Sequence, residues 1–372
     1  MPVKTTDIDT ERRDIDVSKE IARYLPDVNA WLVIALQSRK KTTTDYEFKW
    51  FESDPYGYWT KINHADGYAA DATSLVVDDA SIFAAKDIIK VARTGEVMFC
   101  TAVDTDTNTI TVIRGYGETA GAVIDDDDDL VCLGNAMEEH SSKPTEKLRQ
   151  PSKIYNYCGI MRTPFGVSGT VEASQQITNE QERARLTRDK SIDHRLAIER
   201  QFLFGERKDD TSNKRRMTRG LIKWITTNVY DAGGTLTENE FDKEVCEPVF
   251  KYGSKTKLLV ASPRMVSIIA GWGKEKLQIS QAAKAYGLNL KEYISPHGTL
   301  IIAPSQCLEQ YYAYHSFIVD PQHIFVRVLR DTTLRRNIHN PDTDGFEDEY
   351  LSEIGLELRL EKCHAVIKNA TA

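Results

Sequence analysis

The chain has 372 residues, of which 41% are hydrophobic and 28% are charged, and its formal net charge is −8. This length can supply about two or three folded domains, so the composition excludes a wholly disordered protein. No apolar run approaches the roughly 20 residues of a membrane span, and the first residues lack the apolar core of a signal peptide. We therefore expect no membrane partner, and a site of action in the compartment where the chain is made.

The charge is distributed unevenly along the chain. Residues 66–134 contain 14 Asp and Glu against 4 Lys and Arg, a balance of −10, so the other residues sum to +2. Residues 180–223 contain 13 Lys and Arg against 8 Asp and Glu. The sequence therefore predicts one acidic module and one basic segment in the same chain.

The N-terminal region predicts an arm followed by a long hairpin. Residues 1–28 alternate acidic and basic side chains with few large apolar groups, so we expect an arm without a core of its own. Residues 45–51 alternate aromatic and polar side chains, which is typical of a half-buried strand, and residues 153–158 are a suitable partner. These segments predict an extended hairpin region made of residues 29–65 and 135–173.

The acidic module at residues 66–134 consists of short β-branched runs with turn residues between them. The runs lie at residues 75–77, 87–91, 96–99, 109–113 and 130–133. We expect a small β-barrel or β-sandwich domain inserted at the far end of the hairpin.

The second half of the chain predicts one long helix and then mixed α and β structure. Residues 174–205 favour a charged helix roughly 45 Å long with a narrow apolar stripe, and a basic loop extends this segment to residue 219. Residues 220–322 alternate helical and strand patterns, including a helix start at Ser262-Pro263. Residues 323–372 predict strands that return to the region of the long helix.

The acidic run that closes the module consists of Asp125, Asp126, Asp127, Asp128 and Asp129. Such carboxylates could bind calcium or magnesium, but the run lacks the neutral oxygen ligands that complete a cage. We therefore expect a solvated loop.

The basic segment is densest at six side chains: Arg207, Lys208, Lys214, Arg215, Arg216 and Arg219. These cations could contact nucleic acid phosphates without sequence preference, although the segment contains no aromatic residue for base stacking. Charge neutralisation on a surface loop, or pairing with an acidic neighbour, is an equal alternative.

Other motifs favour no catalytic chemistry. Residues 340–345 copy the first half of a calcium loop, but Leu351 stands where a bidentate Glu must close the shell. The stretch Gly253-Ser-Lys-Thr lacks the first glycine of a phosphate loop, and Phe165-Gly-Val-Ser-Gly lacks the spacing of a nucleophile elbow. The cysteines form no C-x-x-C pair and the histidines no H-x-x-x-H pair, and His194 is expected at a surface or interface. We predict no catalytic, metal-ligating or cofactor-binding residue, no cofactor and no enzyme.

Two independent sets of stretches carry a family resemblance. The first lies in the acidic module, at Ala72-Thr-Ser-Leu-Val-Val-Asp, Arg93-Thr-Gly-Glu-Val and Thr109-Ile-Thr-Val-Ile-Arg-Gly. The second lies at Glu199-Arg-Gln-Phe-Leu-Phe-Gly, Thr218-Arg-Gly-Leu, Tyr293-x-x-x-x-Gly-Thr-Leu-Ile-Ile, Gly355-Leu-Glu-Leu and Cys363-His-Ala-Val-Ile-Lys-Asn. Together they resemble the major capsid proteins of tailed bacteriophages with the Hong Kong 97-type fold, in the subgroup with a β-rich insertion in the hairpin region.

The resemblance implies an α+β fold with an N-terminal arm, an extended hairpin, a spine helix, a peripheral domain and an axial domain at residues 220–322. It also implies a subunit that assembles with itself into hexamers and pentamers of an icosahedral head, which encloses double-stranded DNA. Portal, scaffold and decoration proteins are further expected partners, with assembly in the host cytoplasm and a final location in the virion capsid.

Within such a shell, electrostatics favour the acidic run on the outside and the basic loop on the inside or at a subunit contact. Some members of the family join a hairpin lysine to a neighbour's asparagine. No motif here singles out one of the hairpin lysines, which are Lys49, Lys61, Lys143 and Lys153.

Two alternatives remain open at this point. The first is a cellular nanocompartment subunit or another virion shell protein of the same fold, which would differ in its cargo. The second, less favoured, is an intracellular hydrolase whose site is assembled only in space.

Overall fold

The computed structural model describes residues 39–53, 57–141, 143, 150–174, 181–272 and 291–371. The expected arm at residues 1–28 lies outside these residues. Two compact units are present, and each is described by itself. The small unit is Phe51–Ile154, and the described residues before and after it form the main unit. The small unit is wider than the expected module at residues 66–134, which lies within it.

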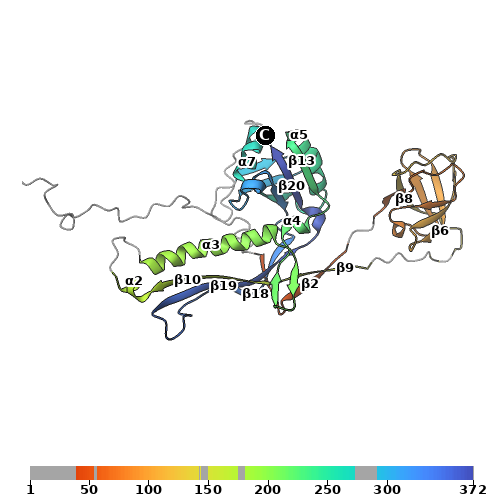
Figure 1. Cartoon of the computed structure of the whole chain (residues 1–372). Coiled ribbons are helices and arrows are strands. Elements are labelled where there is room, and N and C mark those ends of the chain that lie inside the picture. Colours follow the sequence, from red (N-terminus) through yellow and green to blue (C-terminus); the bar gives the residue numbers. More distant parts are fainter. Residues whose placement is uncertain are drawn as a thin grey trace, which may run out of the picture. The chain divides into compact units, whose positions relative to one another are not determined.

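The main unit contains a four-stranded sheet with the order β1-β18-β19-β10 (Figure 1). Its strands are β1 (Lys40–Thr42), β18 (Ile324–Arg335), β19 (Gly345–Leu358) and β10 (Gly159–Ser168). Strands β18 and β19 form a long antiparallel hairpin, and β10 pairs with β19 from Gly159↔Ile354 to Ser168↔Gly345. The sheet therefore joins two segments that are far apart in the sequence.

One long helix, α3 (Glu182–Phe204), lies along β10 and β19 (Figure 1). The helix was expected from residue 174, but Ser174 instead ends the short helix α2 (Gly169–Ala173), so α3 is about 35 Å long. Burial is concentrated in its C-terminal half, where Ile198, Phe202 and Leu203 are buried. The helix ends at Gly205, as the sequence predicts.

A six-stranded sheet forms the other part of the main unit, with the order β13-β20-β17-β14-β16-β15. Its strands are β13 (Val229–Thr235), β20 (Ala365–Thr371), β17 (Ser316–Val319), β14 (Thr256–Ala261), β16 (Thr299–Pro304) and β15 (Lys291–Ile294). The prediction that residues 323–372 return as one segment to the long helix is wrong for β20. Four of its seven residues are apolar and buried, and it pairs with β13 and β17 inside the six-stranded sheet.

Helices cover the core of this sheet. The segments α5 (Glu238–Glu240), η5 (Phe241–Cys246, π-helical) and α6 (Glu247–Phe250) follow one another directly, and the reciprocal capping box of Thr237 and Glu240 starts them. Helix α7 (Pro263–Gly271) begins at Ser262-Pro263, which confirms the predicted start, because the Ser262 side chain accepts from the backbone nitrogen of Met265. None of the helices in the described part of the chain is both long and apolar enough to cross a membrane.

Strands β2 (Glu47–Glu52) and β9 (Ser152–Tyr157) form the predicted two-stranded pair. The alternation holds, because Phe48 and Trp50 are buried whereas Phe51 is 70% exposed. The division between the two units runs through this pair.

The small unit is a six-stranded antiparallel sheet with the order β3-β8-β5-β6-β7-β4. Its strands are β3 (Trp59–Lys61), β4 (Ser74–Val76), β5 (Asp87–Val91), β6 (Val97–Asp104), β7 (Thr109–Ile113) and β8 (Asp129–Asn135). The two edge strands also meet, through the antiparallel bridge Ile62↔Val77 and a backbone hydrogen bond from Asn63 to Val76. The sheet therefore closes around an apolar core that includes Leu75, Ile89, Met98, Ile110 and Leu130.

Candidate functional site

The acidic run in the small unit is a structured turn that leads into β8. Asp128 is buried and accepts two hydrogen bonds from Arg93, Nε to Oδ1 and Nη2 to Oδ2, each 2.7 Å long. Its Oδ2 also accepts from the backbone nitrogen of Asp125 at 2.8 Å. The Arg93 guanidinium holds the pKa of Asp128 below its usual range. The expectation of a fully solvated run is therefore wrong for Asp128, whose carboxylate fixes the turn.

The other four aspartates of the run are exposed. Asp126 Oδ1 accepts from the backbone nitrogen of His64 at 2.9 Å, and Asp125 Oδ2 lies 2.8 Å from Arg93 Nη2. Asp127 has a φ of 63°, a left-handed conformation that Asp tolerates in turns, and Asp129 begins β8. These carboxylates present negative charge to solvent from a turn of fixed shape.

The basic segment forms a short hairpin from β11 (Lys208–Asp210) and β12 (Arg215–Met217). Two glycines close its base, because the backbone nitrogen of Gly220 donates to the carbonyl of Gly205 at 2.7 Å. A Cβ on Gly220 would lie 2.6 Å from the Gly205 nitrogen, which leaves no room for a side chain. The hairpin is therefore held directly after the C-terminus of α3.

Three of the six predicted cations are engaged inside the main unit. The guanidinium of Arg207 lies 4.0 Å from the ring centre of Tyr155, that of Arg216 lies 3.6 Å from Tyr46, and that of Arg219 lies 4.4 Å from Trp224. The hairpin itself contains no aromatic residue, yet the tertiary structure brings three rings to it. Trp224 follows Arg219 by five residues, but no local sequence signal indicates Tyr46 and Tyr155, which belong to the distant β2 and β9 region.

The engaged arginines also make polar contacts. Arg207 Nη1 donates to the carbonyl of Tyr155 at 3.1 Å, and Arg216 Nε lies 3.2 Å from Asp209 Oδ1. Burial lowers the pKa of Arg219, whose Nε donates to the carbonyl of Lys223 at 3.0 Å.

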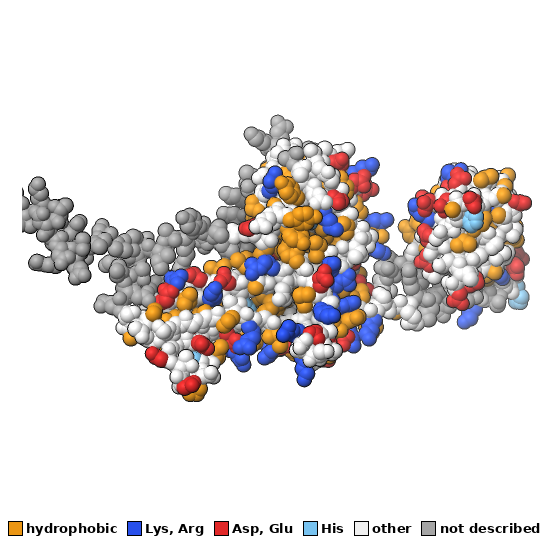
Figure 2. Space-filling view, viewed as in Figure 1, with side chains coloured by type: hydrophobic (Ala, Val, Ile, Leu, Met, Phe, Trp, Pro, Cys, Tyr) orange, Lys and Arg blue, Asp and Glu red, His pale blue; other side chains and the backbone are white. Residues whose placement is uncertain are grey.

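The other three predicted cations, Lys208, Lys214 and Arg215, are exposed at the hairpin. Basic side chains are visible over the lower part of the main unit in Figure 2. The freely presented charge of the hairpin is therefore about half of what the sequence suggests.

A buried ion pair, missed in the sequence, lies in the six-stranded sheet. Lys257 on β14 and Asp320 after β17 both have 0% side-chain exposure, and their Nζ and Oδ2 atoms are 3.4 Å apart. Lys257 Nζ also donates to the carbonyls of Cys363 and Tyr252, at 2.9 and 3.0 Å. Burial lowers the pKa of Lys257, which the charge of Asp320 only partly offsets. The sequence marks Lys257 only as the first residue of a strand.

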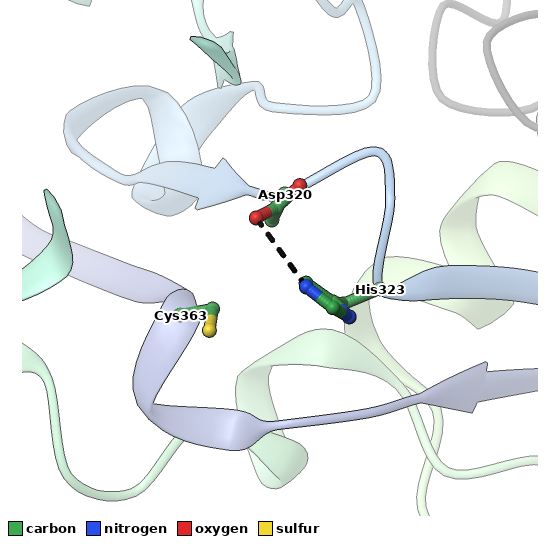
Figure 3. A group of neighbouring side chains, drawn as sticks. All are labelled: Asp320, His323 and Cys363. Atoms are coloured by element: carbon green, nitrogen blue, oxygen red, sulfur yellow. Dashed lines mark ion pairs between the residues drawn. The ribbon is translucent and has the colours of Figure 1, made fainter. Parts of the chain in front are cut away.

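Asp320 also belongs to a group of three side chains with metal-binding atoms (Figure 3). The ligand atoms of Asp320, His323 and Cys363 all lie within 4.8 Å of one another. However, Asp320 Oδ2 accepts from the Ser254 backbone and faces Lys257, whereas Oδ1 accepts from Ser254 Oγ and the Gln322 backbone. Both carboxylate oxygens are therefore saturated, and a cation here would displace the ammonium of Lys257. The arrangement fits a structural ion pair better than a metal site.

His194 on α3 was expected at a surface or interface, and this expectation is wrong because the side chain lies in the interior of the main unit. The side chain is buried between α3 and the sheet, with Nδ1 at 2.9 Å from Thr163 Oγ1 and Nε2 at 2.7 Å from Ser352 Oγ. Burial lowers its pKa. A neutral imidazole can donate to one hydroxyl and accept from the other, so His194 joins α3 to both β10 and β19.

The comparison with protein families decides the identity of this architecture. The model described as SU10 major capsid protein matches residues 2–371. The chain belongs to the SU10 major capsid protein family. This match confirms the resemblance to tailed-phage major capsid proteins that the sequence predicted.

Individual relatives agree with the family. A major capsid protein of Pseudomonas phage PaMx41 is 29% identical over 156 residues, which are 41% of this chain and 37% of that protein. The matched part thus spans little more than a third of that relative.

Solved capsid structures show the fold. The capsid chain of a native GTA particle aligns with a TM-score of 0.53 at 9% identity, over 97% of each chain. A chain of Mycobacterium phage Adephagia aligns with a TM-score of 0.52 at 9% identity over 100% of each chain, and one of Microbacterium phage Oxtober96 with 0.51 at 9% over 96%. At these identities the likeness shows the fold alone, which is the mixed α/β capsid fold of the Hong Kong 97 type.

Proposed function

We propose that this major capsid protein assembles with copies of itself into the hexamers and pentamers of an icosahedral tailed-phage head that encloses double-stranded DNA. The family match over residues 2–371 carries this proposal, and the long helix on a long-stranded sheet supports it. The role is structural and not enzymatic. The head is assembled in the host cytoplasm and receives portal, scaffold or decoration proteins as further partners.

Electron microscopy of the purified recombinant chain tests this function. We expect closed particles, or free hexamers and pentamers, because extended elements such as the β18–β19 hairpin need partners to bury their surfaces. A monomer that light scattering finds at every concentration, under conditions where the chain is folded, would contradict the proposal. Particles that package a protein cargo and exclude DNA would favour a nanocompartment instead.

We also propose that the small unit is an inserted β-domain of the hairpin region. Its strands pair with one another, its core cluster is drawn from its own residues, and both chain ends leave it at the β2–β9 pair. Replacing residues 54–149 by a short Gly-Ser linker tests this assignment. We expect the main unit to fold with unchanged thermal stability, whereas global unfolding would show that the small unit belongs to a shared core.

For the charged loops, we propose that the exposed aspartates of the run face outward and that the hairpin cations face inward or a neighbouring subunit. Packaged DNA is a dense polyanion, so it repels exposed carboxylates and exchanges its counterions for Lys208, Lys214 and Arg215. Screening confines both effects to about 8–10 Å at ordinary salt. A reconstruction of the head that placed the aspartates on the inner wall would overturn this polarity.

A further inference from the structure

Strand β19 carries three buried glutamates on the face of the four-stranded sheet that is turned away from α3. Glu349, Glu353 and Glu357 are spaced four residues apart, so they share one side of the strand at intervals of roughly 14 Å. Ser352, on the opposite side, faces α3 through His194. The three glutamates are 1%, 6% and 0% exposed. Since buried carboxylates require partners, something on this face must cover them.

Five arginines pair with these carboxylates, and Phe48 packs against Gly355 on the same face, between Glu353 and Glu357. Glu349 accepts from Arg162 Nε at 2.6 Å and from Arg335 Nη1 at 3.2 Å. Glu353 accepts from Arg330 Nε at 2.6 Å. Glu357 accepts from Arg327 and, at 2.5 Å, from Arg359 Nε. We call this set of eight side chains the arginine face.

The arginine face has its anions inside and its cations outside. The side chains of Arg162, Arg330 and Arg335 are 58%, 47% and 53% exposed, although the carboxylates that hold them are buried. Burial would raise the pKa of Glu349, but hydrogen bonds from Arg162 and Arg335 lower it below its usual range, so this carboxylate stays charged. A guanidinium has five N–H donors and uses one or two here, so the others are presented in a fixed orientation. Five arginines over three glutamates leave a balance of +2.

This arrangement favours a protein partner over a nucleic acid. Each arginine is held in one orientation by a carboxylate and the net charge of the face is only +2, which suits a protein surface that matches its free N–H donors better than a dense polyanion. The face also includes Ile160, the cross-strand partner of Glu353, which is 50% exposed. Arginines held in place beside an exposed aliphatic side chain are typical of energetically important protein contacts.

We propose that the arginine face is a contact surface between subunits and that it binds the acidic small unit of a second copy of this chain. Charge complementarity identifies this occupant, because residues 66–134 carry a balance of −10 while the other residues sum to +2. Asp125, Asp126 and Asp127 are exposed carboxylates on a turn of fixed shape, which suits bidentate pairing with oriented guanidinium groups. The proposal rests on the shell-forming function proposed above.

Arginine footprinting tests the contact. A dicarbonyl reagent, phenylglyoxal, modifies accessible guanidinium groups, and mass spectrometry of the full chain reports each site. We expect Arg162, Arg330 and Arg335 to react in dispersed subunits and to lose reactivity by about five-fold or more in assembled particles, since interface cores exclude water. Particles in which these arginines stay reactive would overturn the proposal while leaving the shell function intact.

A deletion tests whether the small unit of a second copy covers the arginine face. In particles made from the chain in which a short Gly-Ser linker replaces residues 54–149, we expect the three arginines to react as in dispersed subunits. Continued protection in those particles, protection only when DNA is present, or protection already in the dispersed subunit would each overturn the proposal. A wild-type chain that forms no particle at all would overturn the shell function together with it.

A matched pair of variants measures how much Arg335 contributes to assembly. Arg335→Gln leaves Glu349 paired with Arg162, so the fold is retained, and Arg336→Gln changes the neighbouring exposed arginine. We expect Arg335→Gln to raise the concentration needed for assembly about ten-fold, as for loss of one contact of moderate strength, and Arg336→Gln to leave it nearly unchanged. Equal effects of the two variants would contradict a specific contact.

Discussion

The small and main units satisfy their buried charges in different ways. In the small unit, Arg114 pairs with Glu96 and Arg93 with Asp128, residues only 18 and 35 positions apart in the chain. In the main unit, Arg183 pairs with Asp348 and Arg162 with Glu349, across 165 and 187 positions. The small unit therefore pairs these buried charges within its own segment. The main unit combines short-range pairs, such as Arg330 with Glu353 across 23 positions, with pairs between segments far apart in the chain.

The histidines also differ between the two units in their burial. In the main unit, His194, His315 and His364 are buried, and burial lowers the pKa of each, that of His364 to about 3. In the small unit, His64 and His140 are exposed. The two units should therefore differ in how their stability depends on sequence changes and on pH.

The largest expected effect is the loss of the buried carboxylate of Asp320 in the main unit. Asp320→Ala leaves the ammonium of Lys257 buried without its anion, so we expect the main unit to lose about 3–5 kcal/mol. Hydrogen exchange in increasing urea, read separately on peptides from β14 and from β5, measures both units. The small unit should be unchanged.

Asp231→Ala is the matched control, because this exposed aspartate of the same sheet makes its hydrogen bonds at the surface, with Asn369 and the backbone nitrogen of Gly233. It should cost less than about 1 kcal/mol. An equal loss from both variants would show that burial of the Lys257–Asp320 pair is not what matters.

Acidification should destabilise the main unit first. The buried histidines stay neutral in the folded state, whereas in the unfolded chain they protonate near pH 6.5. The unfolded state therefore binds more protons, and the stability of the main unit falls as the pH drops below about 6.5. In the small unit, hydrogen bonds from Arg93 lower the pKa of Asp128, and hydrogen bonds from Arg114 lower that of Glu96 against the effect of burial. Their contribution persists until the pH falls through these lowered values.

Exchange measurements between pH 7 and pH 3 check this order. His194→Gln removes one titrating group from the main unit and should flatten its pH dependence between about pH 6.5 and the lowered pKa of His194. If both units lost stability over the same pH range, the expected difference between them would be contradicted.

The smallest expected effect separates two neighbouring aspartates in the acidic run. Asp128→Asn weakens the buried pair with Arg93 and should destabilise the small unit by about 1–3 kcal/mol. Asp127→Asn should change stability by less than about 0.5 kcal/mol, because Asp127 is exposed, lies 3.8 Å from Lys61, and Asn tolerates its positive φ. Thermal unfolding followed on small-unit peptides measures both, and a larger loss from Asp127→Asn would reverse the assignment of roles.

The sequence predicted most of the elements that depend on local pattern. The alternation of Phe48 and Trp50 with polar residues, the helix start at Ser262-Pro263, the end of α3 at Gly205 and the strands of the small unit are all present. Period-two burial, helix caps and turn residues act within a few neighbours along the chain, so their effects can be read from a single segment. The fold itself was predicted from the family resemblance, which depends on several such segments in the same order along the chain.

Only the tertiary structure shows which charged and polar side chains are buried and which are exposed. Asp128 and Asp127 are identical neighbours in the sequence, yet one is buried by Arg93 and the other is exposed. His194, Lys257 and Glu349 are polar residues that are buried where segments far apart in the sequence supply their partners. Burying a charge is unfavourable unless a partner is present, and the position of that partner depends on sheet pairing across the whole chain. The sequence by itself therefore determined the elements and the family, whereas the pairing of distant strands determined which charges are structural and which remain available for contacts.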